Sequence, residues 1–138
     1  MDPLVTGAHW LAGRACLRVF HGLPLVEVEL RDAPSVFETA RREVALTLAA
    51  EPADDNRVLG LLVGAEACRR AGEIPDNWLA MLTAVVGSPW REYLPPRARE
   101  RVRMRWHNIE RVAAELLYTR FVLVSRVVEL CGVRDFVS

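Results

Sequence analysis

Apolar residues recur along most of this chain at steps of three or four, which is the period of an amphipathic α-helix. Glycine followed by proline interrupts the pattern at 22–24, 72–75 and 87–89. Glycine suits the residue after a helix and proline suits the first turn of the next one. The helices predicted between these marks span residues 3–21, 34–50, 55–71, 75–87, 96–118 and 119–131. The pattern therefore predicts an all-α fold.

The predicted helices differ in how much of their circumference is apolar. In the first helix, Leu4, Ala8 and Leu11 begin a single apolar stripe, so we expect an amphipathic helix with one face in water. The segment 75–87 has apolar side chains in nearly every direction: Trp78, Leu79, Met81, Leu82, Val85 and Val86. A helix of this kind is surrounded by protein. We expect 75–87 to be a central hydrophobic helix with amphipathic helices around it.

Two segments fit the helical pattern less well. Residues 25–30 alternate between apolar and acidic side chains, which predicts a short extended segment. Arginine occupies every second position from 97 to 105, but we predict a helix there because Pro95 and Pro96 suit its first turn. Residues two apart on a helix lie about 200° apart, so these arginines spread around it. An unrelated helical nucleic-acid-binding protein stays open as an alternative, although we expect no nucleic-acid partner.

The composition places the chain among folded domains. With 138 residues, 51% hydrophobic and 26% charged, the sequence predicts one domain covering 1–138. A formal net charge of zero provides no chain-wide attraction to nucleic acid. The three cysteines are too few and too far apart for a disulfide framework, so we expect core thiols and a reducing compartment. No uninterrupted run of 18 apolar residues is present, which argues against a membrane span.

The sequence lacks the patterns that usually carry catalysis. We find no nucleophile beside a base, no carboxylate pair that marks a cleft and no phosphate-binding glycine loop. The histidines share no metal-ligand spacing with the cysteines. Gly60 and Gly64 indicate close helix packing, or a helix weakened by about 1 kcal/mol at each glycine. We therefore expect a protein that is not an enzyme and needs no cofactor or metal.

Four segments resemble the homology motifs of the Bcl-2 family of apoptosis regulators. Asn77-Trp78 and the apolar run after it resemble the first motif, whose pattern is Asn-Trp-Gly-Arg followed by apolar residues. Residues 58–72 resemble the helix that precedes this motif and forms one wall of the family's groove. Residues 33–42 are similar to the third motif, and residues 131–137 resemble the second, Gly-Gly-Trp-Asp-x-Phe-Val. The order and nearly the spacing are those of the family.

The resemblance implies a Bcl-2-like helical bundle that blocks apoptosis. The small size and the absence of lysine resemble homologues carried by large DNA viruses such as iridoviruses and poxviruses. Such a protein sequesters the death-motif helices of pro-apoptotic relatives such as Bim, Bak or Bax, in the host cell cytoplasm or at the mitochondrial surface. The groove residues implied are Phe37, Val44, Val58, Leu62, Arg69, Arg70, Asn77, Trp78, Leu79 and Leu82. Pairing of two copies across the same groove, as a homodimer, is a further expectation.

The chain departs from the family pattern within the first motif. Ala80 stands where the family has the arginine that pairs with the aspartate of the bound helix, and Leu79 replaces a glycine. Asn77 retains a hydrogen bond to the ligand, and Arg69 or Arg70 is the candidate to replace the lost charge. An alternative is a Bcl-2-fold protein with a closed groove that binds host proteins and inhibits innate immune signalling.

Overall fold

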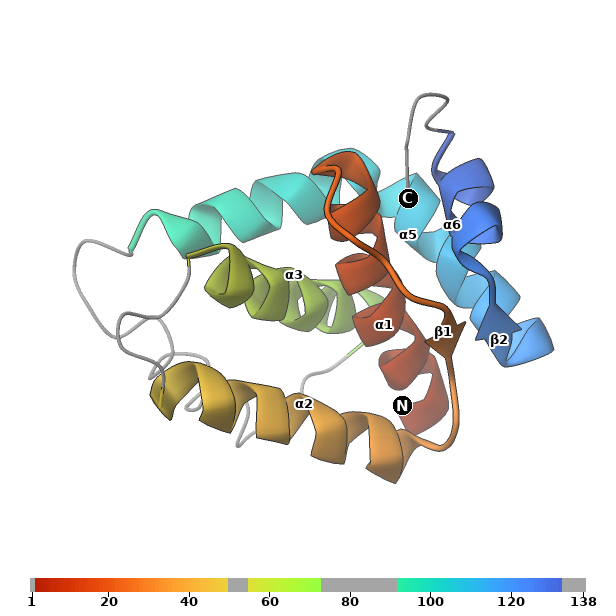
Figure 1. Ribbon diagram of the computed structural model, residues 1–138, viewed down its shortest axis with the longest axis horizontal. Coiled ribbons are helices and arrows are strands. Elements are labelled where there is room, and N and C mark those ends of the chain that lie inside the picture. Colours follow the sequence, from red (N-terminus) through yellow and green to blue (C-terminus); the bar gives the residue numbers. More distant parts are fainter. Residues whose placement is uncertain (1, 50–54, 73–91, 133–138) are drawn as a thin grey trace.

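The computed structural model describes residues 2–49, 55–72 and 92–132, and this part of the chain is mostly helical (Figure 1). Its helices are α1 (Pro3–Phe20), α2 (Ala33–Ala49), α3 (Asp55–Ala71), α5 (Leu94–Thr119) and α6 (Val124–Cys131). The helices predicted at 3–21, 34–50, 55–71 and 96–118 are confirmed, with ends that differ by at most two residues. The predicted central helix 75–87 lies outside the described residues. The all-α prediction is confirmed for the part described.

The predicted helix 119–131 is wrong over its first turn. Arg120 has φ of 66°, and this left-handed conformation ends α5 at Thr119. The next residues form strand β2 (Phe121–Val122), which pairs antiparallel with β1 (Val28–Glu29). The Leu30 N–H donates to the Arg120 carbonyl oxygen at 2.8 Å and extends this contact. The extended segment predicted at 25–30 is therefore confirmed at β1, while α6 begins only at Val124.

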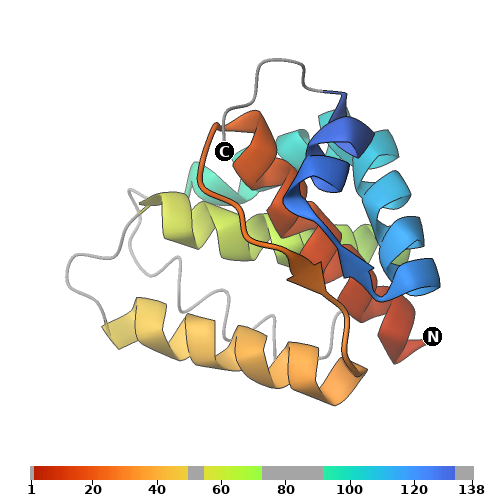
Figure 2. The ribbon, with the colours of Figure 1, turned by 45° about the vertical axis from the view of Figure 1, so that its right-hand side comes forward.

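Helix α1 lies in the middle of the described helices and contacts α2, α3, α5 and α6 (Figures 1 and 2). The sequence predicted that this first helix is amphipathic with one face in water, and that prediction is wrong. The buried residues of α1 face nearly all directions: Thr6, Gly7, Ala8, His9, Trp10, Ala12, Gly13, Ala15, Cys16, Leu17 and Val19. Most of them are small, so neighbouring helices approach α1 closely without a continuous stripe of large apolar residues.

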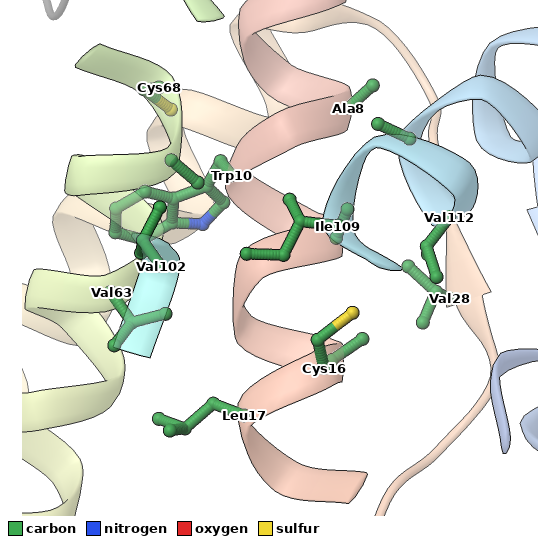
Figure 3. Packing of buried hydrophobic residues seen from close by; sticks show 14 of the residues in the cluster. Ala8, Trp10, Cys16, Leu17, Val28, Val63, Cys68, Val102, Ile109 and Val112 are labelled. Atoms are coloured by element: carbon green, nitrogen blue, oxygen red, sulfur yellow. The ribbon is translucent and has the colours of Figure 1, made fainter. Parts of the chain in front are cut away.

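Helices α1 and α3 pack closely through glycine. A Cβ atom at Gly64 would lie 2.7 Å from Cε3 of Trp10, and one at Gly13 would lie 2.9 Å from the Ala67 Cβ. Trp10 projects from α1 toward α3 and is only 2% exposed (Figure 3). The close packing predicted from the glycines of α3 is therefore confirmed at Gly64. At Gly60, in contrast, a Cβ would meet only Nη2 of Arg14, at 4.0 Å.

Helix α5 adds the third side of the core. Pro95 and Pro96 occupy its first turn, where a missing N–H breaks no helical hydrogen bond. Its buried residues include Val102, Ile109 and Leu116, which recur every seven residues and so lie on one face of the helix. In the described residues, no helix combines the length and the apolar character that a membrane crossing requires.

Candidate functional site

A groove of about 990 Å³ lies between α1, the segment 23–31, α2 and the first turns of α3. Its lining mixes apolar and charged side chains from these four parts of the chain. The lining residues are Trp10, Leu11, Arg14, Ala15, Leu17, Arg18, Leu23, Pro24, Leu25, Val26, Glu27, Val28, Glu29, Arg31, Ser35, Val36, Thr39, Glu43, Asn56, Arg57 and Gly60. A groove of this volume is at the upper end of the range that small-ligand pockets cover, about 300–1,000 Å³.

Arginines of α1 fix two walls of this groove. Arg14 forms an ion pair with Glu43 of α2, and its guanidinium lies 5.5 Å from the centre of the Trp10 ring. One turn later, Nη1 of Arg18 donates to the carbonyl oxygen of Pro24 at 2.8 Å. The first contact positions α2 beside α1, and the second positions the 23–31 segment, so both walls are attached to the central helix.

Asp32 fixes the start of α2. Its carboxylate accepts hydrogen bonds from the Ser35 N–H at 2.8 Å and from the Ser35 hydroxyl at 3.1 Å. This arrangement satisfies an N–H group that has no partner within the helix. The same two hydrogen bonds hold the pKa of the Asp32 carboxyl below its usual range. The cap therefore sets where α2 leaves the 23–31 segment and where the groove wall begins.

The size of the groove suits a short helical segment. A helix with side chains is about 10 Å across and rises 1.5 Å per residue, so 990 Å³ corresponds to about eight residues, or two turns. Val26 is 75% exposed and, with Leu25, supplies apolar surface from the 23–31 segment. Arg31 and Arg57 contribute positive charge to the lining, and Glu27 contributes negative charge. The groove therefore offers apolar contacts together with groups that can pair with either sign of charge.

The groove residues predicted from the motifs occupy other positions. Val44 and Val58 are buried in the core, and Phe37 and Leu62 are half-buried and packed against it. Arg69 and Arg70 contact side chains that do not line the groove. Arg69 pairs with Glu66 on its own helix, and the Arg70 guanidinium lies 5.0 Å from the centre of the Trp106 ring. The structure does not place these six side chains in the lining of the 990 Å³ groove.

The remaining predicted groove residues lie outside the described part of the chain. They are Asn77, Trp78, Leu79 and Leu82. Sequence reasoning did not place α1 or the 23–31 segment in the groove. The available signals were the alternation at 25–30 and the pair Arg14 and Arg18, which lie one turn apart on α1.

In the described residues, several histidines and arginines outside the groove contact other side chains or the backbone of the fold. Nδ1 of His9 lies 2.8 Å from the Val5 carbonyl oxygen, and the His9 ring stacks on the Trp106 ring. In the ranges 2–49, 55–72 and 92–132, no three His, Cys, Asp or Glu side chains gather as metal ligands would. On α5, Arg103 pairs with Glu100 at 2.6 Å, and Arg105 lies over the Phe20 ring at 3.9 Å. The alternating arginines thus take up different contacts around the helix.

Comparison of the chain with protein-family models, with curated proteins and with solved structures finds no match.

Proposed function

We propose that this chain is a Bcl-2-like helical protein that captures an amphipathic helix of a pro-apoptotic partner in a groove. The observation that carries the proposal is the groove between α1, the 23–31 segment, α2 and α3, which combines apolar walls with charged groups. Capture of an amphipathic helix needs an apolar cleft that accepts side chains spaced three or four residues apart. The four homology-like segments of the sequence supply the identity of the partner: death-motif helices of Bim, Bak or Bax.

The volume of the groove sets the affinity that we expect. Two turns of helix present about three apolar anchors, and burial of each contributes roughly 1.5–3 kcal/mol, or about 5–9 kcal/mol together. The partner helix loses conformational freedom on binding, and this cost reduces the total. Since a Kd of 1 μM corresponds to about −8 kcal/mol and a Kd of 1 mM to about −4 kcal/mol, we expect a Kd between about 10 μM and 1 mM. Arg57 in the lining is the candidate to pair with the aspartate of the death motif, because Ala80 offers no charge.

Titration of labelled Bim, Bak and Bax death-motif peptides by fluorescence polarisation tests the proposal. Gly60 lines the groove and has open space beside it, so Gly60→Leu places a side chain in the groove without striking the core. We expect Gly60→Leu to weaken binding at least tenfold, the effect of losing about 1.4 kcal/mol. Ala114→Leu adds the same side chain at an exposed position of α5 and is the matched control.

The same titration distinguishes the two placements of the groove. If Asn77→Ala abolishes binding and Gly60→Leu retains it, the peptide binds at the residues implied by the first homology motif and not in the 990 Å³ groove. Absence of binding to every peptide at about 1 mM protein would refute helix capture, whichever residues line the groove.

The partner class also determines where the protein acts and what competes with it. We propose that it acts as a viral-type protein in the host cell cytoplasm, at the mitochondrial surface where pro-apoptotic relatives act. A second copy of the chain is a competitor for the same apolar groove, which would produce a homodimer. Sedimentation of the chain with and without saturating peptide tests this, because a groove-mediated dimer dissociates as peptide binds.

A further inference from the structure

Two cysteines from opposite ends of the chain meet in the core. The sulfur of Cys16 on α1 lies 3.5 Å from the sulfur of Cys131 on α6, across 115 positions of sequence. Their side chains are only 1% and 5% exposed. A disulfide has an S–S distance of about 2.05 Å, so a relative movement of about 1.5 Å separates this contact from a covalent bond. Cys68 takes no part, since its thiol donates to the Thr6 carbonyl oxygen at 3.3 Å.

A small cavity leads to this pair. Its volume is about 60 Å³, and Cys16 forms part of its wall with Phe20, His21, Arg101 and Arg105. His21 is solvent-exposed, so the cavity extends to the protein surface. A cavity needs about 10–15 Å³ to admit one water, so about four waters fit here. Hydrogen peroxide, with two heavy atoms, is small enough to enter, whereas glutathione disulfide is far too large.

Arginines beside the pair favour its ionisation. The hydrogen bond with Cys16 and then the charges of Arg105 and Arg111 lower the pKa of the Cys131 thiol. The hydrogen bond with Cys131 and burial raise the pKa of Cys16, so the pair loses its first proton mainly from Cys131. The guanidinium of Arg105 is held over the Phe20 ring at 3.9 Å. Since the thiolate is the reactive form of cysteine, these charges promote reaction at a buried position.

We propose that Cys16 and Cys131 are a peroxide-sensitive dithiol, and that oxidation to a disulfide fastens α6 covalently to α1. The sulfur-to-sulfur contact supplies the pair of reacting atoms, and the cavity beside Cys16 supplies an entrance sized for a small peroxide. This inference does not depend on the proposed capture of a partner helix. A reversible disulfide of this kind suits a reducing compartment, where disulfides form transiently in response to oxidants.

The reaction balances with one molecule of hydrogen peroxide. The pair gives the Cys131 proton to the medium, because the pKa of Cys131 is lowered and that of Cys16 is raised. The Cys131 thiolate attacks one peroxide oxygen and the O–O bond breaks, which gives a Cys131 sulfenic acid and a hydroxide that takes the Cys16 proton. The Cys16 thiolate then attacks the Cys131 sulfur. The S–S bond forms, and the leaving hydroxide takes a proton from the medium, so two waters are produced in total.

The disulfide would reinforce the position of α6. Val127 and Leu130 bury apolar side chains, and the Asn108 amide nitrogen donates to the Leu130 and Cys131 carbonyl oxygens at 3.3 and 3.4 Å. A covalent link between residues this far apart removes a large part of the freedom of the unfolded chain. We expect the oxidised protein to melt at least about 10 °C above the reduced protein.

Treatment of the reduced full-length chain with hydrogen peroxide tests the proposal. We expect the intact mass to fall by two hydrogen atoms, the peptide map to link Cys16 with Cys131, and only Cys68 to remain available for alkylation after unfolding. Cys68→Ser, the matched control, should form the same link, whereas Cys16→Ser and Cys131→Ser should not. Glutathione disulfide should react far more slowly than peroxide because it cannot enter the cavity.

Four results would overturn the inference, and all of them use the wild-type chain, so they hold even if a serine variant fails to fold. The first is no mass loss while the protein stays folded, and the second is a link that contains Cys68. The third is equally fast linkage in the urea-unfolded chain, which would mean that the fold does not position the sulfurs. The fourth is a linked protein whose melting temperature does not rise.

Discussion

Gly64→Ala tests the central packing of this fold, because it adds one carbon atom where the Trp10 ring of α1 packs against α3. The new Cβ would lie 2.7 Å from Cε3 and 2.9 Å from Cζ3 of Trp10, both below the closest approach of real Cβ atoms. The indole ring is a rigid group, and Trp10 is only 2% exposed. The contact is therefore relieved only by moving α1 and α3 apart.

The expected magnitude combines two opposing effects. Alanine is favoured over glycine inside a helix by up to about 1 kcal/mol. Overpacking of a close-packed core costs typically about 1–3 kcal/mol. We therefore expect Gly64→Ala to lower the free energy of unfolding by about 1–2 kcal/mol. Gly60→Ala, one turn earlier, meets only Nη2 of Arg14 at 4.0 Å, so it should raise the free energy of unfolding by up to about 1 kcal/mol.

Urea unfolding followed by far-ultraviolet circular dichroism measures both variants on the same helix. We expect their unfolding free energies to differ by roughly 1–3 kcal/mol, with equal slopes against urea concentration. If Gly64→Ala stabilises the protein as much as Gly60→Ala does, Trp10 does not pack on Gly64 and the α1–α3 contact described above is wrong.

Three further changes probe the ends of helices. Hydrogen bonds from Ser35 lower the folded-state pKa of Asp32, so this carboxylate stabilises the protein above its ordinary pKa and loses that effect as pH falls through the lowered value. The stability difference between wild type and Asp32→Ala, measured by urea unfolding, should shrink on acidification. Arg126 of α6 donates to Glu115 of α5 at 2.9 and 3.3 Å, and a double-mutant cycle with Glu115→Gln and Arg126→Ala should yield a small favourable coupling free energy. A coupling of zero would show that the pair does not hold α6. Arg120 has a left-handed conformation, which costs about 1–2 kcal/mol for a residue with a Cβ atom. Glycine adopts this conformation without that cost, so the thermal midpoint of the Arg120→Gly variant should rise, whereas that of Arg120→Ala should not.

The sequence predicted elements whose ends carry local signals. Pro95 and Pro96 marked the start of α5, and the alternation at 25–30 marked the strand β1. The extended residues between α5 and α6 were missed because Arg120, and not glycine, takes the left-handed conformation there. The burial of α1 was missed because glycine and alanine, which produce it, carry little hydrophobic signal in a periodicity count.

The candidate sites depend on contacts between distant parts of the chain, which periodicity cannot reveal. The 990 Å³ groove joins α1 to α2 and α3 through pairs such as Arg14 with Glu43. The contact of Cys16 with Cys131 joins residues 115 positions apart. The prediction of core thiols was right about their burial and gave no sign of this proximity. The motif resemblance predicted groove residues on α2, on α3 and at 77–82, and none in the 23–31 segment.

The central place of α1 has a consequence for how the protein is made. This helix leaves the ribosome before α5 and α6, which cover much of it and end about 100 residues later. At a synthesis rate of about 5–20 residues per second, the helix waits roughly 5–20 s for those partners. During this interval Trp10 and the small apolar side chains around it lack their final neighbours. Nascent chains of this protein should therefore depend on chaperones until α5 and α6 have been translated.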